Sequence, residues 1–573
     1  MTYIKNYNTM EWKNIKWKNI EFYIFKLQKK IYQASKNNNT LEMFRLQKIL
    51  INSKAAKLKA VRRVTQDNLG KKTAGVDGVK SIIPNERLEL ANSLSLDGKA
   101  SYIKRTYIPK SENEQRPLGI PTIKDRAKQY LALLALEPQW EAKFEPNSYG
   151  FRPGRSCHDA IEAIFIAINQ KPKYVLDADI QGCFNEINHG ALIAKLSTFP
   201  LLEKQIKAWL KAKILEDNAL MLVEKGTPQG SLLSPLLMNI ALHGMEQAVI
   251  DFMKSLILKD CSGKNIIKRR RASSINIIRY ADDFVILHEN ALVIKSCKEF
   301  IEGFLSNLGL KLKNSKTQIC NTLDSFENNL PGFDFLGFNI RQYPIGKYTV
   351  RKTKISLKHR TLIRPSKAKI KEHFKSIKKV IDNTKKTDVL LMKLNPKITG
   401  WARYYSTVVS FKTFKWLDTL LFKALLKWQY KKHPTRSRKW LNQLYYHKKE
   451  GKNWVFGIKS PDNNELISIK SYSNVPIERF VKVKGKKSPY DGDSLYWSFR
   501  LNNHPVMSGN VSKLLKKQKG LCNLCKLPFF PTDILEQDHI IPLSKNGSNK
   551  ISNIQLLHGH CHKIKTANDR KLM

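Results

Sequence analysis

Two adjacent aspartates between strand-like runs constrain this chain more than any other feature. In INIIRYADDFVILHEN, apolar runs flank Tyr280, Ala281, Asp282 and Asp283. This pattern predicts a β-hairpin with the two acids at its tight turn. A surface hairpin with solvated acids is the simplest alternative. Two carboxylates held together on a rigid turn repel each other unless a cation binds between them, so the hairpin predicts a metal-dependent site.

A second acidic strand favours the metal site over the surface hairpin. The run YVLDADIQGCFNEINH predicts a strand with Asp177 and Asp179 on the same face, so periodicity alone leaves the choice between them open. Phosphoryl transfer by two Mg²⁺ ions needs carboxylates from separate strands, because one ion activates the attacking 3′-hydroxyl and the other holds the triphosphate. The two acidic runs together predict a two-metal nucleic-acid polymerase site.

The charge balance indicates a polyanionic partner. The chain has 101 Lys and Arg against 48 Asp and Glu, a formal net charge of +53. Neutralising phosphates releases condensed counterions, so we expect tight, salt-dependent binding to RNA or DNA. Composition does not choose between the two. No run of eighteen apolar residues occurs, so no membrane partner is expected.

The organisation along the chain predicts a multidomain α+β protein. Alternating strand-like and helical runs over residues 86–345 indicate the catalytic core. Helical, basic patterns over residues 1–85 and 346–450 predict helical regions on either side, and the first is expected to bind RNA. In the second, Ile370, Phe374, Ile377 and Ile381 form an apolar stripe with Lys367, Lys371, Lys375 and Lys378 off it. Interleaved aromatic and basic residues there favour RNA binding over a solvated lysine face. Residues 451–508 are irregular and basic, as in a DNA-binding region, and residues 509–573 form a compact Cys/His-rich end.

The acidic strand resembles that of the reverse transcriptases encoded within group II introns, in which an aromatic residue follows the catalytic aspartate by five positions. Asp179 and Phe184 fit this pattern. The resemblance implies that Asp179, Asp282 and Asp283 hold the two Mg²⁺ ions. It also implies that Phe184 is an aromatic gate beneath the sugar that favours deoxynucleotides, the alternative being a core phenylalanine. The family more often has Asp at Asn185, a position with no ligand role.

Further motifs of this family follow in order along nearly the whole chain. They are RPLGIPTIKDRAKQ, SYGFRPGRSCHDAI, GTPQGSLLSPLLMNIAL, LGLKLKNSKTQI and FDFLGFNI. The resemblance implies a right-hand polymerase with fingers and palm. The residues that it assigns to dNTP or template are Lys110 and Arg116 for the triphosphate, Arg152 and Arg155 for template phosphates, Gln229 for the nucleotide sugar, and Lys316 for the leaving pyrophosphate.

The run KLNPKITGWARYYS resembles the helical thumb, called domain X, of intron maturases. The run QDNLGKKTAGVDG, near the start of the chain, matches the N-terminal extension of the same family. The resemblance implies that the protein binds its own group II intron RNA and holds it in a splicing-competent fold. The RNA supplies the splicing chemistry, so no residue is assigned as a splicing catalyst.

Four residues near the C-terminus have the spacing of a structural zinc site. Cys522 and Cys525 form one pair, and His558 and Cys561 form a second pair with the same spacing. Two such pairs suffice for a tetrahedral Zn²⁺. His560 is an alternative fourth ligand.

The other polar residues of this tail resemble an HNH endonuclease, a ββα-metal fold. The resemblance implies that His539 is the general base, that Asp538 and His562 hold a catalytic divalent ion, and that Asn553 fixes the loop carrying the base. A zinc-stabilised DNA-binding knob without chemistry is the alternative. Ser548 replaces a glycine common in the family loop.

Taken together, these motifs imply a multifunctional intron protein. It would be an RNA-directed DNA polymerase, a splicing maturase and a DNA endonuclease that together support target-primed reverse transcription. Its partners would be intron RNA, target DNA and dNTPs; a homodimer stays open. The alternatives are a splicing-only maturase with decayed enzymatic sites and a retron-like reverse transcriptase. The filled acidic and zinc positions argue against decay. Richness in Lys, Asn and Ile predicts a plastid stroma, with a bacterial cytoplasm as the alternative.

Overall fold

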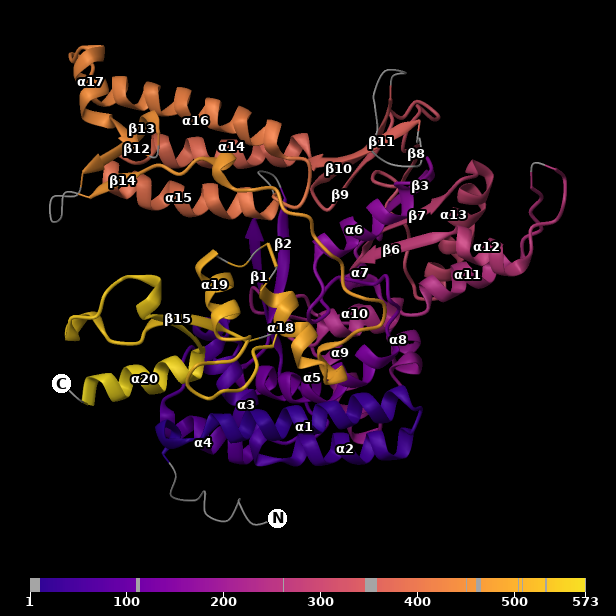
Figure 1. Ribbon diagram of the computed structural model, residues 1–573. Coiled ribbons are helices and arrows are strands. Elements are labelled where there is room, and N and C mark those ends of the chain that lie inside the picture. Colours follow the sequence, from indigo (N-terminus) through magenta and orange to yellow (C-terminus); the bar gives the residue numbers. More distant parts are fainter. Residues whose placement is uncertain are drawn as a thin grey trace.

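The computed structural model describes residues 11–109, 114–260, 262–345, 358–449, 451–459, 465–502, 504–505, 507, 509–530 and 533–571. Lys110, which was predicted to bind the triphosphate, lies outside them. The chain is a mixture of helices and several small sheets, as the sequence predicted. N-terminal helices form the base of the molecule in Figure 1, a helical bundle forms the top, and the C-terminal domain lies at one side of the base. No helix among the described residues is both long and apolar enough to cross a bilayer.

A layer of N-terminal helices packs against a long helix of the central region. On the first helix, Ile20, Ile24, Leu27 and Ile31 recur at helical spacing and are all buried. The predicted boundary after residue 85 falls inside the last helix of this group, which packs on the third. The helices that we call the N-terminal layer are α1 (Trp17–Lys36), α2 (Thr40–Asn52), α3 (Lys54–Arg62) and α4 (Pro84–Ser93), and they pack on α5 (Ile123–Lys143) or on one another.

A four-stranded antiparallel sheet carries the predicted acidic hairpin. Its strand order is β6-β7-β3-β8, and we call it the acidic sheet. Both faces of the sheet are largely buried, because helix α6 (Cys157–Ile168) packs on one face and helix α13 (Ala291–Ser306) packs on the other. The strands are β3 (Tyr174–Asp179), β6 (Asn276–Tyr280), β7 (Asp283–His288) and β8 (Gln318–Asn321).

The central region also contains a second four-stranded sheet. The second sheet has the order β2-β1-β4-β5, with β1 antiparallel to β2 and parallel to β4. Its strands are β1 (Ile103–Pro109), β2 (Gln115–Ile120), β4 (Ile214–Glu216) and β5 (Ala219–Met221). The remaining helices of the central region are α7 (Cys183–Glu186), α8 (His189–Leu196), α9 (Pro200–Leu210), α10 (Ser234–Leu242), α11 (Met245–Ser255) and α12 (Lys268–Ser274).

Three long helices form the bundle at the top of Figure 1. Ile377 and Ile381 of the predicted apolar stripe are buried, whereas the lysines between them face outward. The predicted boundary at residue 450 falls between paired strands β12 and β13. The elements are β9 (Phe333–Phe335), β10 (Phe338–Pro344), β11 (His359–Pro365), α14 (Lys367–Asp382), α15 (Thr387–Tyr404), α16 (Phe411–Lys432), α17 (Arg438–Tyr445), β12 (Tyr446–Lys449), β13 (Lys452–Lys459) and β14 (Leu466–Ser468).

Residues 478–500, which we call the strap, run from the bundle back along the central region. The backbone N–H of Val483 donates to Asp159 over 2.7 Å, and Arg500 pairs with the same carboxylate. The Trp497 ring lies so close to Gly154 that a Cβ there would overlap it. The strap includes η5 (Pro489–Asp491) and most of α18 (Ser494–Asn502). These contacts attach the strap firmly to the central region.

The C-terminal domain is a small ββα unit with its own core. Strands β15 (Leu535–His539) and β16 (Ile554–His558) pair antiparallel, and α20 (Gly559–Lys571) follows them. Helix α19 (Gly509–Lys517) packs against β16. The hydrophobic core of the C-terminal domain is separate from the other hydrophobic clusters and includes Leu514, Leu515, Phe529, Leu556 and Leu557.

The contact between the strap and α5 yields a pH-dependent prediction. Tyr490 donates a hydrogen bond to Glu137, and burial raises the pKa of this carboxyl from an ordinary 4.5 to about 7. The folded protein therefore binds more protons than the unfolded chain between these values, and its free energy of unfolding falls as pH rises through them. Glu137→Gln is neutral at every pH and should remove this loss, which is at most about 3 kcal/mol.

The prediction is checked by melting temperatures between about pH 5 and about pH 8. The difference in melting temperature between Glu137→Gln and the wild type should increase in favour of the variant as the pH rises. Glu302→Gln changes an exposed carboxylate on α13 and should follow the wild-type curve. A constant difference between Glu137→Gln and the wild type across this range would show that Glu137 is not held protonated by the fold.

Candidate active sites

The acidic hairpin forms as predicted, with a two-residue turn. Tyr280 pairs with Asp283, which leaves Ala281 and Asp282 at the tip. Ala281 has φ of 60°, in the left-handed region that tight hairpins require. Gly150 of the SYGFRPG motif abuts this turn so closely that a Cβ would overlap the Ala281 backbone. A glycine at position 150 is therefore needed for the turn to sit where it does.

Strand register decides which aspartate of β3 faces the hairpin acids. Asp179 is the direct partner of Asp283, and the carbonyl of Asp282 accepts a hydrogen bond from Ile180 over 3.2 Å. Asp177 lies opposite Val285 and accepts a hydrogen bond from Gln318. The structure therefore brings Asp179, Asp282 and Asp283 together and places Asp177 two residues further along the strand.

The carboxylates of Asp179, Asp282 and Asp283 are partly buried and repel one another. Burial raises the pKa of Asp283 to about 7, with repulsion from Asp282 and Asp179 adding to the effect. Burial also raises the pKa of Asp282. Lys316 partly offsets this charge, because its Nζ lies 2.7 Å from Asp179 Oδ2. Carboxylates held this close and out of water favour a bound multivalent cation, which fits two Mg²⁺ ions.

Hydrogen bonds connect the second sheet to the helix that follows β3. Arg116 Nε donates to Gln229 Oε1 over 2.8 Å, and Gln229 Nε2 donates to Asn185 Oδ1 over 3.0 Å. Gly226 has φ of 83° and presses against the Asn185 backbone. Sequence reasoning assigned no role to Asn185. The structure makes this amide the partner of Gln229, and the unusual amide at that position was the only signal in the sequence.

The surroundings of Phe184 have features of both expected roles, a gate beneath the nucleotide sugar and a core phenylalanine. It is only 8% exposed, and its ring meets Phe151 edge-on with 6.2 Å between centroids. Phe151 is 55% exposed and has φ of 57°, rare for a bulky residue. An exposed aromatic ring therefore stands beside the buried one, and Phe151 was not singled out from the sequence.

The predicted phosphate contacts of Arg152 and Arg155 are not met in this structure. Arg152 is buried and binds both carboxylate oxygens of Glu141, at 2.8 and 2.9 Å, together with two backbone carbonyls. Arg155 is buried and donates to the carbonyls of Pro146, Gly485 and Lys487. These are structural contacts that join the motif to α5 and to the strap. The physical reason is burial, which leaves neither guanidinium open to a template.

The Cys/His cluster of the C-terminal domain has the geometry of a metal site. The ligand atoms of Cys522, Cys525, His558 and Cys561 all lie within 4.8 Å of one another, and all four residues are buried. Asp533 Oδ2 lies 3.3 Å from His558 Nε2, as expected of a carboxylate that orients a metal-bound imidazole. Three thiols and one imidazole in a closed site suit Zn²⁺. His560, the alternative ligand, points instead toward the N-terminal layer.

The predicted nuclease residues converge at the open edge of the ββα unit. Asp538 and His539 end β15, and His562 lies on α20 with Nε2 at 3.5 Å from Asp538 Oδ1. Lys565 also approaches Asp538, at 3.1 Å. This edge therefore offers an imidazole and a carboxylate to one divalent ion, and His539 follows Asp538 at the end of the strand.

The loop between β15 and β16 is fixed by asparagines. Asn553 accepts from the Ile541 N–H and donates to the carbonyls of Ile541 and Ser548 over 2.9 Å. Asn549 Oδ1 lies 2.9 Å from His539 Nε2. Asn553 thus fixes the loop, as predicted, and Asn549 holds the ring of His539. Sequence reasoning missed Asn549, because nothing in its spacing distinguishes it from other loop residues.

Four families match successive parts of the chain. Residues 12–94 match the N-terminal domain of reverse transcriptase, and residues 108–340 match reverse transcriptase (RNA-dependent DNA polymerase). Residues 368–446 match the group II intron maturase-specific domain, and residues 522–568 match HNH endonuclease. The order is the one predicted from the motifs.

Several curated proteins are similar over most of their length. Protein YkfC of Escherichia coli (strain K12) is 30% identical over 351 residues, which are 55% of this chain and 88% of that protein. Group II intron-encoded protein LtrA of Lactococcus lactis subsp. cremoris is 26% identical over 496 residues, 74% of this chain and 77% of LtrA. Maturase-like protein 1 of Euglena gracilis is 26% identical over 414 residues, 71% of this chain and 80% of that protein. The chain therefore belongs to the group II intron-encoded proteins and is a reverse transcriptase with a maturase domain and an HNH endonuclease domain.

Proposed function

We propose that this protein copies its intron RNA into DNA at a target site that its own nuclease has nicked. The observation that carries the proposal is the register of the acidic sheet, which sets Asp179 opposite Asp283 and beside the turn residue Asp282. The nuclease would cut one strand of the target DNA, and the freed 3′-hydroxyl would prime synthesis. A splicing-only maturase is not favoured, because the acidic and Cys/His residues are all in place.

In the polymerase reaction, Asp179, Asp282 and Asp283 would bind two Mg²⁺ ions. When bound, these ions would activate the primer hydroxyl and neutralise the triphosphate. Lys316 lies beside Asp179 and would meet the leaving pyrophosphate. Arg116 and Gln229, already joined by a hydrogen bond, would hold the incoming nucleotide, with Lys110 as a further triphosphate ligand. Phe184 would exclude a 2′-hydroxyl by contact with the sugar.

The polymerase regions map onto the sheets and the bundle. The acidic sheet would be the palm, the β1–β2 sheet the fingers, and helices α14–α16 the thumb. The lysines of α14 that lie off its apolar stripe are exposed and would contact intron RNA, together with the N-terminal layer. Residues 451–508 would contact target DNA mainly outside the strap, since the strap is occupied by the central region.

In the nuclease reaction, His539 would take a proton from the attacking water, and Asn549 would hold its ring. Asp538 and His562 would bind one divalent ion, which when bound would stabilise the charge that develops on the phosphate. Zn²⁺ at Cys522, Cys525, His558 and Cys561 would be structural, because a closed four-ligand site leaves no position for water.

We propose the plastid stroma as the compartment, with a bacterial cytoplasm as the alternative.

The proposal is tested with purified protein, intron RNA and an intact target duplex that is labelled on the primer strand. His539→Ala should lower nicking of that strand by about a hundredfold or more, since a general base is typically worth 10² to 10⁴ in rate. Intron-templated cDNA joined to the target should fall equally. On a duplex nicked beforehand at the same position, the variant should make cDNA at the wild-type rate. Joined cDNA from His539→Ala on intact target at the wild-type level would contradict priming by this nick.

A further inference from the structure

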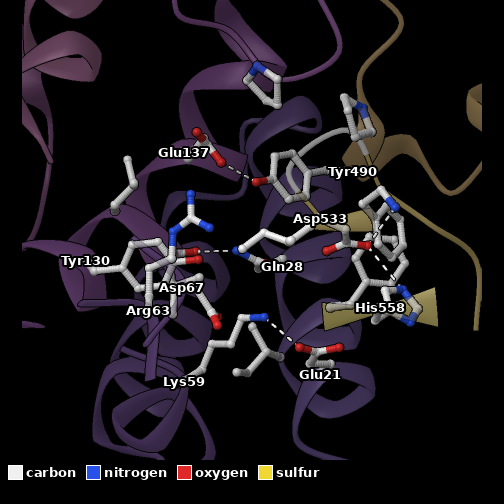
Figure 2. A pocket seen from close by; sticks show the side chains of 18 of the residues that line it. Glu21, Gln28, Lys59, Arg63, Asp67, Tyr130, Glu137, Tyr490, Asp533 and His558 are labelled. Atoms are coloured by element: carbon white, nitrogen blue, oxygen red, sulfur yellow. Dashed lines mark hydrogen bonds and ion pairs between the residues drawn. The ribbon is translucent and has the colours of Figure 1, made fainter. Parts of the chain in front are cut away.

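The nuclease domain is held against the N-terminal layer across a seam made largely of polar contacts. We call this boundary the docking seam; it consists of Glu21, Phe25, Lys59, Arg62 and Asp67 on one side and Phe530, His560 and Lys563 on the other. A cavity of about 520 Å³ lies within it. Figure 2 shows Glu21 with Lys59, Asp533 with His558, and Tyr490 with Glu137 around this cavity.

Arg62 connects the two domains. Its Nη2 lies 3.3 Å from His560 Nδ1, its Nη1 donates to Glu21 over 3.1 Å, and its Nε donates to Asp67 over 3.1 Å. An arginine can only donate, so the His560 nitrogen is the acceptor. Arg62 is 5% exposed, and such a buried, multiply bonded guanidinium allows little rotation. The position of His560 is therefore fixed relative to α1 and α3.

The orientation of the catalytic helix follows from this contact. His560 lies in the first turn of α20, the helix that also carries His562. A second contact joins the rings of Phe25 and Phe530, with 4.3 Å between centroids, and Phe25 lies one turn along α1 from Glu21. The polar contact at His560 and this ring contact together hold the nuclease on the layer.

The seam is not needed to build the nuclease fold. The hydrophobic core of the nuclease is a cluster of its own, distinct from the core that includes the N-terminal layer. The Cys/His cluster lies wholly within the C-terminal domain. Contacts across the seam are charged groups and one ring pair around a cavity, rather than continuous apolar packing. Interfaces of this kind join domains that fold separately.

We propose that the N-terminal layer is the seat of the nuclease and that Arg62 is a positioning residue, which fixes where the nuclease cuts relative to the polymerase site. The inference rests on the proposed function in one respect, that the nuclease cuts the priming strand. With the nuclease seated, DNA held by the polymerase and intron RNA meets His539 at one phosphate. With the seat broken, the nuclease would move on its connection and reach several phosphates.

The experiment uses the full chain with its intron RNA and compares Arg62→Ala with Phe530→Ala, which removes a contact from the nuclease side. Both variants should spread the nick over several phosphates and lower the rate at the wild-type position about tenfold. The matched control is Lys171→Ala, an exposed lysine just before β3 that pairs with Glu289 over 3.1 Å. It should cut at one position at the wild-type rate.

Further readouts separate loss of the seat from loss of folding. Both seam variants should keep the wild-type zinc content and oligonucleotide-primed cDNA synthesis within about twofold, and X-ray scattering should show a larger maximum dimension. If Arg62→Ala loses the N-terminal fold, Phe530→Ala decides the result. A single nick position at the wild-type rate, or an unchanged scattering profile, would overturn the proposal. If the wild type itself does not nick, the proposed function fails, and scattering alone judges the seat.

Discussion

Asp283→Asn should lower the rate of oligonucleotide-primed cDNA synthesis on an RNA template by about a thousandfold or more, which corresponds to about 4 kcal/mol in the activation free energy. Asparagine keeps the size of the side chain and removes its charge. Asp283 lies on β7 directly opposite Asp179 and next to Asp282, and burial with mutual repulsion holds its pKa well above the usual range. A site arranged in this way loses cation binding when one charge is removed.

A neighbouring carboxylate provides the control. Asp334 is exposed on β9, where it accepts a hydrogen bond from Asn339, and Asp334→Asn should retain synthesis within about twofold. Both variants should bind intron RNA as the wild type does, because neither aspartate belongs to the basic surfaces that we propose contact the RNA phosphates. Synthesis by Asp283→Asn above a tenth of the wild-type rate would refute the assignment of this site.

Cys522→Ser should remove the bound zinc and lower DNA nicking by about a hundredfold or more, while cDNA synthesis from an oligonucleotide stays near the wild-type rate. Cys522 is fully buried among the other three ligand atoms, and the surrounding core is small. Small metal-bound domains draw much of their folding free energy from the metal, so loss of one thiolate should unfold this one. The polymerase has separate cores and should be unaffected.

Metal analysis and the two activity assays on one preparation check this result. The control is Cys157→Ser, since Cys157 lies outside the cluster and its contact with Tyr404 is one that a hydroxyl can also make. It should keep the wild-type zinc content and nicking rate. Full zinc occupancy together with normal nicking in Cys522→Ser would mean that the cluster is not the structural site.

Much of the site could be predicted from local sequence because its determinants are local. The YADD hairpin needs only a turn residue that tolerates positive φ between two apolar strands, and it forms at Ala281. The pairs of ligands at Cys522 and His558 are set by short spacings within single loops and a helix start. Helical stripes such as that of α1 follow from a period of 3.6 residues.

Other features depend on partners far along the chain, which spacing cannot reveal. Arg152 and Arg155 have the composition of phosphate ligands, and their burial arises from Glu141 and from strap residues 330 or more positions away. Asn185 and Asn549 gain their roles only when Gln229 and His539 are brought to them. In each case burial and hydrogen bonding are decided by packing between elements.

By itself, the sequence determined the chemistry: which strands carry acids, which residues can bind a metal, and the order of the four regions that match known families. Alternation left Asp177 and Asp179 open and the family resemblance indicated Asp179; the tertiary structure supplies the physical reason, because strand register sets Asp179 opposite Asp283. Only the tertiary structure placed Arg62 against His560, 498 residues apart, since a contact between separately folded domains leaves no periodic trace in either segment.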